Sequence, residues 1–180
     1  MRALLTLALL TLCAFAAQEE LGAAKPLEQH EWLHQLVGEW KVSSSATLEP
    51  GAEPMTWEST ESVRSIGGLW IVAEGSATFQ GKPFTSLLTL GYDPNEDAFV
   101  GTWVDTMQAT LWTYVGHLDE SERILTLESE GPSFGDPKKN ALYRDQIELI
   151  GSDQRKLTSS ALGDDGTWTV YMTGVYERVK

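Results

Sequence analysis

The sequence contains a single cysteine, Cys13, which follows an apolar run over residues 3–12. Arg2 places a positive charge before this run, and Ala14-Phe15-Ala16 has the small-x-small pattern of a cleavage site, so residues 1–16 are predicted to be a signal peptide. A run of about ten to fourteen apolar residues is too short to remain in a bilayer as an anchor. Cleavage after Ala16 removes Cys13, so the mature chain is expected to have no disulfide and no thiol nucleophile. These features predict a periplasmic or secreted protein that is stabilised by its buried core.

Positive charge is scarce: 13 Lys and Arg residues face 26 Asp and Glu residues, and the net charge is −13. Proteins that bind nucleic acid or anionic membrane surfaces carry the opposite excess, so neither is expected as a partner. The acidic residues are spread along the chain and are not gathered in a tail. This distribution is typical of a solvated surface.

Histidine is also scarce, and two of the three form His30-Glu31-Trp32-Leu33-His34. This His-Glu-x-x-His spacing places two imidazoles one helical turn apart, where they can share a zinc ion beside a glutamate that activates water. A metalloprotease site needs a third ligand, and the remaining histidine, His117, is predicted at the end of a distant strand. We therefore interpret the pair as solvated side chains and predict no metal ion. One histidine suffices as a haem ligand, but at a strand end it is more often structural, so no cofactor is predicted.

Long helical patterns are missing from the chain. Residues 17–25 show no periodicity and are predicted to be a flexible mature N-terminus. Pro26 suits the first turn of a helix, and a short amphipathic helix is predicted over residues 26–37. The apolar residues that share one face of this helix are Trp32, Leu33, Leu36 and Val37. We predict a single domain over residues 26–180, with the helix lying across one end of it.

From Trp40 onward the period of the hydrophobic pattern is two, which is typical of strands that bury one face. The predicted strands cover residues 40–48, 57–63, 69–79, 85–92, 99–105, 110–118, 124–130, 142–150, 157–162 and 168–178. Their short links favour consecutive antiparallel hairpins, and closure of the sheet removes its exposed edges. We therefore predict an all-β, antiparallel up-and-down barrel of about ten strands, with a two-sheet sandwich as the alternative.

The first strand begins with Gly38-Glu39-Trp40, directly after the predicted helix. A Gly-x-Trp sequence at this place is typical of a lipocalin-type barrel, because glycine permits a tight turn and the tryptophan can lie across one end. All seven tryptophans lie beyond the predicted signal peptide. Indoles in this number either fill a disulfide-free core or line an apolar cavity. Trp103 and Trp112, in the middle of neighbouring strands, are the two that we expect to face a cavity.

Two carboxylates are predicted on the inner wall of the barrel, because Glu61 and Asp145 alternate in phase with the apolar residues of their strands. A buried charge needs a partner or takes up a proton. We expect Arg64 and Arg144 to be these partners, with Glu128 competing for their guanidinium groups. Three interpretations stay open: an ion-pair network that fixes strand register, the polar end of a ligand pocket, and the paired carboxylates of a hydrolase.

Several longer motifs can be compared with known families. They are residues 28–42 (EQHEWLHQLVGEWKV), 60–70 (TESVRSIGGLW), 90–93, 100–105 (VGTWVD), 125–132, 143–145 and 157–160. Together they resemble a bacterial family that is known only as a domain of unknown function and is regarded as lipocalin-like. The resemblance covers nearly the whole mature chain and implies a calycin-type barrel with no established activity, substrate or cofactor. Members of that family carry a residue other than histidine at the position of His34, which argues further against zinc.

We expect this protein to bind a small, largely apolar molecule inside the barrel. The residues predicted to line the cavity are Trp103, Trp112 and Tyr143, and those predicted at its polar end are Glu61, Arg64, Arg144 and Asp145. One alternative is a non-catalytic interaction protein of the cell envelope whose barrel is filled with side chains. Another is an enzyme that uses the interior carboxylates. No catalytic residue is assigned.

Overall fold

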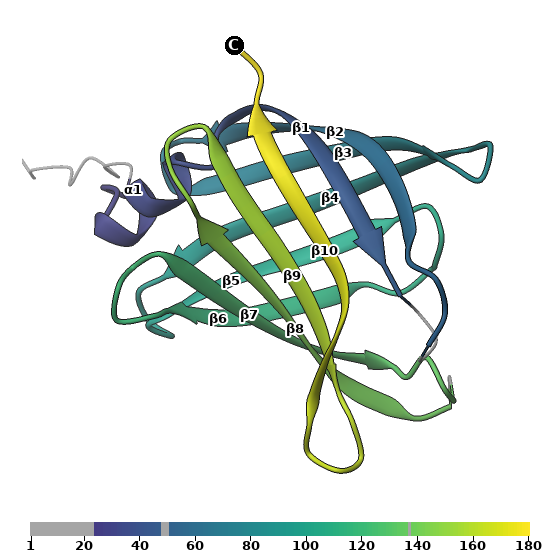
Figure 1. Cartoon of the computed structure of the whole chain (residues 1–180). Coiled ribbons are helices and arrows are strands. Elements are labelled where there is room, and N and C mark those ends of the chain that lie inside the picture. Colours follow the sequence, from purple (N-terminus) through teal and green to yellow (C-terminus); the bar gives the residue numbers. More distant parts are fainter. Residues whose placement is uncertain (1–23, 48–50, 137) are drawn as a thin grey trace, which may run out of the picture.

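In a computed structural model that describes residues 24–47, 51–136 and 138–180, the chain forms one short helix and ten strands (Figure 1). The elements are α1 (Glu28–His34), β1 (Gly38–Ala46), β2 (Met55–Ile66), β3 (Trp70–Phe79), β4 (Lys82–Asp93), β5 (Ala98–Asp105), β6 (Trp112–Leu118), β7 (Ile124–Pro132), β8 (Asn140–Leu149), β9 (Gln154–Leu162) and β10 (Trp168–Arg178). The predicted signal peptide, residues 1–16, lies outside the described residues. Within the described ranges, no helix has the length and apolar character needed to cross a membrane.

The strands form one closed antiparallel barrel in which each strand pairs with its neighbours in sequence. The barrel closes between the first and last strands, where Trp40 lies opposite Arg178 and Ala46 lies opposite Met172. Closure of this kind leaves no unpaired sheet edge. The prediction of a ten-stranded antiparallel barrel with a short N-terminal helix is confirmed, and the sandwich alternative is excluded.

Side chains alternate between the two faces of the barrel wall, as the sequence predicted. In β2 the residues Trp57, Glu61 and Val63 are more buried than the residues between them. The strand boundaries differ from the prediction at several places. Strand β9 begins at Gln154 and not at residue 157, and this extension places Arg155 on the inner wall.

Helix α1 covers one end of the barrel (Figure 1), where it contacts β3 and β4. At seven residues it is shorter than the predicted segment 26–37. Trp32 and Leu33 on its inner face are buried, and so is Leu36 in the turn that follows. A helix of two turns is not stable in isolation, so this apolar contact is what holds it in place.

The two histidines of α1 have different environments, and the prediction that both are solvated is wrong for His30. His30 is 4% exposed, and its Nδ1 accepts a hydrogen bond of 2.9 Å from the backbone N–H of Leu27. Its ring meets Tyr92 edge to face, with 5.8 Å between the ring centres. His34 is partly exposed and lies 3.5 Å from the carboxylate of Glu31. Because one ring packs into the barrel end and the other faces solvent, the two imidazoles do not form one site.

The hydrophobic core fills the half of the barrel next to α1. Among its largest fully buried side chains are Leu33, Leu36, Trp40, Ile71, Leu90 and Phe99. They come from the helical segment and from strand ends that lie beneath it. This end of the barrel is therefore closed by packed side chains.

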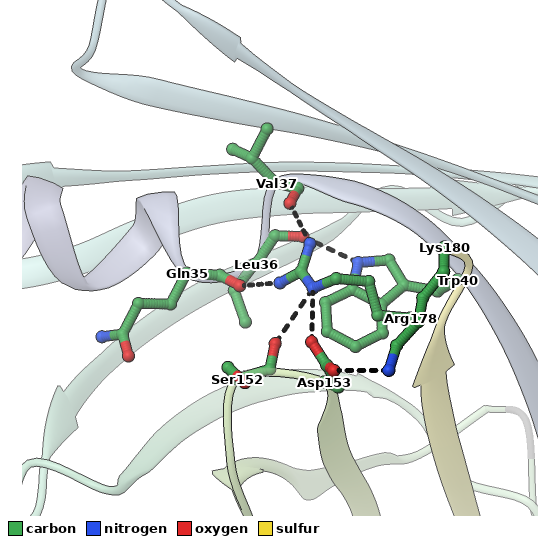
Figure 2. Close-up of polar contacts among 8 residues, drawn as sticks. All are labelled: Gln35, Leu36, Val37, Trp40, Ser152, Asp153, Arg178 and Lys180. Carbon is green, nitrogen blue, oxygen red and sulfur yellow. Dashed lines mark hydrogen bonds and ion pairs between the residues drawn. The ribbon is translucent and has the colours of Figure 1, made fainter.

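Arg178 fastens the helical segment to the barrel (Figure 2). Its guanidinium group donates hydrogen bonds to the carbonyl oxygens of Val37 at 2.6 Å, Gln35 at 2.8 Å and Ser152 at 2.9 Å. The same group lies over the indole of Trp40, 4.2 Å from the ring centre. One cation thus satisfies carbonyl groups after the end of α1, which have no partner within the helix. Trp40 lies at this end of the barrel, as the Gly-x-Trp sequence predicted.

Candidate functional site: a cavity at the end opposite the helix

The half of the barrel away from α1 is hollow. It contains a cavity of about 310 Å³ whose lining residues come from all ten strands. This is roughly the volume that ten water molecules occupy in the liquid, and it lies at the small end of the range for ligand pockets. Met107 and Phe134, which belong to loops and are largely exposed, mark the mouth of the cavity. The space therefore suits a small molecule that enters between these loops.

The wall of the cavity is rich in aromatic rings. They are Trp57, Phe79, Phe84, Trp103, Trp112, Tyr114, Phe134, Tyr143 and Tyr171. Tyr143 meets Trp112 and Phe134 edge to face, at 5.1 Å between ring centres in each pair. Phe134 meets Tyr171 in the same way, also at 5.1 Å. Such contacts hold the rings in fixed orientations, so the wall is preorganised.

Asp145 on β8 places a carboxylate in this wall. Its Oδ2 accepts a hydrogen bond of 2.6 Å from the hydroxyl of Tyr114. Its Oδ1 is buried and has no hydrogen-bond partner in the described part of the chain. Burial raises the pKa of the Asp145 carboxyl above its ordinary value, and the hydroxyls of Ser159 and Tyr114 lower the pKa in part. Burial, and then the charge of Asp145, also raise the pKa of the Tyr114 hydroxyl.

A second carboxylate in the wall, Asp105, is occupied by protein donors. Its Oδ1 accepts hydrogen bonds from the backbone N–H groups of Met107 at 2.7 Å and Gln108 at 3.1 Å. Its Oδ2 accepts a hydrogen bond of 3.1 Å from the indole N–H of Trp103. Asp105 therefore holds the loop after β5 and orients one ring of the wall.

The structure brings four of the seven predicted site residues together. Trp103, Trp112, Tyr143 and Asp145 all line the cavity. That they bind a ligand stays a prediction. They reach the same space because β5, β6 and β8 each turn an inner face toward it.

Glu61 points into the barrel as predicted, but it does not line the cavity, and its partner is Arg155 and not Arg64. The side chains of this pair are 10% and 5% exposed. The guanidinium group of Arg155 also lies over the rings of Tyr176 and Trp40, 4.0 and 4.7 Å from their centres. The pair belongs to the packed half of the barrel, so Glu61 and Asp145 do not meet in one space.

The expected placement of Arg64 and Arg144 at the polar end of the cavity is wrong. Arg64 is exposed on the outer face of β2. Arg144 pairs with Glu128 across the outer surface, with 2.6 Å between Nη2 and Oε1, and lies 3.9 Å from the ring centre of Trp168. Both arginines directly follow an inward-facing residue, and consecutive side chains of a strand point to opposite faces.

The residues that sequence reasoning missed fall into two groups. Tyr114 stands two positions after Trp112, so the alternation that selected Trp112 also indicates Tyr114. Tyr171 and Met172 both line the cavity although they are adjacent, because the pairing of β10 with β9 shifts register at this point. Phe134 lies in a loop, where no periodicity exists. A strand pattern does not reveal residues of this second kind.

The histidines contribute no metal site in the residues that the structure covers. No group of three or more His, Cys, Asp or Glu side chains there is arranged to hold a metal ion. His117, which was weighed as a haem ligand, is exposed on the outer face of β6. Its imidazole does not reach the cavity.

The fold and the cavity define a small closed β-barrel with one packed end and one hollow, aromatic-lined end. The chain belongs to the family described as "Protein of unknown function (DUF1579)", whose model matches residues 25–178. The predicted resemblance to a family of unknown function is thereby confirmed.

Two solved structures that match the chain are a natural protein and a redesigned one. The crystal structure of Rv2717c from M. tuberculosis has 12% identity and a TM-score of 0.59, and the match covers 87% of this chain and 100% of that chain. A redesigned β-barrel, mFAP1 bound to DFHBI, has 16% identity and a TM-score of 0.42, with 81% and 96% covered. The likeness to Rv2717c shows a shared fold. No curated protein matches the sequence.

Proposed function

We propose that this protein binds a small, largely apolar molecule in the hollow half of its barrel. The cavity of about 310 Å³ carries this proposal. Protein interiors are normally packed to the density of organic crystals, and the half of this barrel near α1 follows that rule. A preformed apolar cavity with a few polar groups is the usual form of a small-molecule site. The hollow end favours this function over a barrel filled with side chains.

A hydrolase that uses paired carboxylates has no comparable support. Glu61 is neutralised by Arg155 in the packed half, whereas Asp145 faces the cavity. A mechanism with two carboxylates needs both groups on one substrate. We therefore assign binding and no catalytic step to this site.

The proposed setting is extracytoplasmic, and the proposed kinship is with lipocalin-like barrels. The signal-peptide pattern of residues 1–16 supports the extracytoplasmic location. Gly38-Glu39-Trp40 at the entry to β1 and the cavity open at one end support the relation to lipocalin-like barrels. N-terminal sequencing of protein recovered from its own host should begin near residue 17. A chain that still begins at Met1 would contradict export.

The binding function is tested with a substitution that fills the cavity. Ala77 lines the cavity, and Ala77→Phe should place a ring in the space, whereas Ser76→Phe adds the same ring on the outer face of the same strand. Native mass spectrometry of protein from its own host should find a retained small molecule in the unchanged protein and in Ser76→Phe. The molecule should be missing from Ala77→Phe. Retention by all three proteins would place the ligand elsewhere and refute the proposal.

A further inference from the structure

The charges of the cavity wall all have one sign. Asp105 and Asp145 line the cavity, and no Lys, Arg or His side chain is found among the described residues that line it. Arg155 is buried inside the barrel, but it pairs with Glu61 and does not line the cavity. An anionic guest would therefore meet two carboxylates and no cation.

The two carboxylates differ in what they offer a guest. Protein donors already fill both oxygens of Asp105, as described above. Asp145 keeps a buried Oδ1 without a geometrically well-formed hydrogen bond among the described residues, although the hydroxyl of its cross-strand neighbour Ser159 lies near enough to lower the pKa of the carboxyl. The hydroxyl of Ser129, also in the wall, is a second buried group without a partner. Two residues of the cavity wall therefore each carry a buried polar atom without a hydrogen-bond partner among the described residues.

The aromatic wall favours the same kind of guest as the free carboxylate oxygen. Ring faces carry partial negative charge and attract cations, most strongly for tryptophan. Three of the rings in the wall are indoles, those of Trp57, Trp103 and Trp112. Burial raises the pKa of the Asp145 carboxyl, and a cationic guest in the cavity would stabilise the charged carboxylate.

We propose that the cavity selects hydrophobic amines, whose ammonium group pairs with the carboxylate of Asp145 while the apolar body packs among the aromatic rings. The selection rests on the proposed binding function and narrows its ligand class. A neutral alcohol of the same shape fills the apolar space without the charge pairing. A carboxylate of the same shape is rejected, because it meets a buried like charge and leaves Oδ1 without a donor.

The proposal is tested with three probes of one shape: 4-phenylbutylamine, 4-phenylbutanol and 4-phenylbutyrate. Titration calorimetry at pH 7 with the full mature protein gives the three dissociation constants. The amine should bind about 10- to 100-fold more tightly than the alcohol, which is the range expected for a charge-assisted hydrogen bond to a buried group. The butyrate should bind more weakly than the alcohol.

Two carboxylate substitutions assign the selectivity to one residue. Asp145→Asn should remove the advantage of the amine and leave the affinity for the alcohol within about threefold, because the apolar contacts remain. Glu128→Gln, on the outer face, should leave all three affinities unchanged. If Asp145→Asn does not fold, the probe series on the unchanged protein still decides the question.

The outcomes separate this inference from the binding function on which it rests. Three outcomes would overturn the amine selection and leave apolar binding in place. They are equal binding of the amine and the alcohol, a preference for the butyrate, and an amine preference that survives in Asp145→Asn. Failure of all three probes to bind would count against both.

Discussion

The buried pair of Glu61 and Arg155 provides a direct test of how the barrel interior is stabilised. Glu61 lies on β2 and Arg155 on β9, two strands that β1 and β10 separate in the barrel wall. The pair therefore spans the interior. Arg155→Met keeps the apolar stem and its contact with Tyr176 but leaves the carboxylate of Glu61 buried without a cation. Loss of one partner of a buried pair typically costs about 3–5 kcal/mol, because the remaining charge is uncompensated.

Urea unfolding followed by tryptophan fluorescence measures this cost. Arg155→Met should lower the free energy of unfolding by about 3–5 kcal/mol with an unchanged m-value. For a domain of this size the midpoint of thermal unfolding should fall by roughly 6–20 °C. The double substitution Glu61→Leu with Arg155→Met should recover most of the loss, since an apolar replacement of a buried pair is often neutral or stabilising.

The outer pair of Arg144 and Glu128 is the matched control, because its side chains are 30% and 49% exposed. Arg144→Met should cost no more than about 1 kcal/mol, as measured for exposed ion pairs. If Arg155→Met costs as little as Arg144→Met, the interior is wetter than the structure indicates and the reasoning fails. The same conclusion would follow if the double substitution were no more stable than Arg155→Met alone.

Three further substitutions test other parts of the barrel. Arg178→Lys should lose some of the hydrogen bonds that Arg178 donates to carbonyl oxygens after α1. The backbone amides of α1 should then exchange hydrogen faster, while the amides of the strands keep their protection. Gly131→Ala should displace the indole of Trp112, because a Cβ at this position would overlap the ring; near-ultraviolet circular dichroism should change, and far-ultraviolet spectra should not. Asp145→Asn should stabilise the protein at neutral pH. The pKa of Asp145 is higher in the folded state than in the unfolded chain, so the folded state holds this proton more tightly. The free energy of unfolding of the unchanged protein should therefore fall as pH rises from about 4 through the raised pKa. Urea titrations of the asparagine variant should not show this decline. A decline of equal size in both proteins would contradict the assignment.

The parts of the site that sequence could predict are those that depend on strand alternation. Glu61, Tyr143 and Asp145 follow the apolar period of their strands, and a barrel wall with one buried face turns that period into an inner surface. The same rule places Arg64 and Arg144 outside. Charge complementarity favoured them as partners of the interior acids, but the geometry of a strand does not permit a side chain to change faces.

Partners across the barrel could not be predicted in this way. Arg155 is 94 residues from Glu61 in sequence, and its strand begins earlier than its apolar pattern indicates. The register shift in β10, which brings both Tyr171 and Met172 to the cavity, leaves no mark on the hydrophobic period. Pairings of this kind depend on closure of the whole sheet, which no local window of sequence contains.

Whether a barrel is filled or hollow depends on what enters its ends. At one end α1 and the following turn supply Trp32, Leu33 and Leu36, and these large side chains close the barrel over Trp40. Toward the other end, the described inner wall includes small residues such as Ala46 and Ala77, so the rings opposite them enclose space. Composition alone does not distinguish these cases, since both halves are rich in tryptophan. The difference arises because one end receives a helix and the other, in its described part, is bordered by loops.

Asp145 lies where these two halves meet. Its hydrogen-bond partner Tyr114 belongs to the packed core and also lines the cavity. A charge without a cation at this boundary weakens the folded state, as its raised pKa indicates. A guest that neutralises the charge would therefore stabilise the packed half as well as fill the hollow one. Binding of 4-phenylbutylamine should consequently raise the midpoint of thermal unfolding more than the same concentration of 4-phenylbutanol does, because the charge pairing lowers the dissociation constant of the amine, and equal shifts would show that the charge is already compensated.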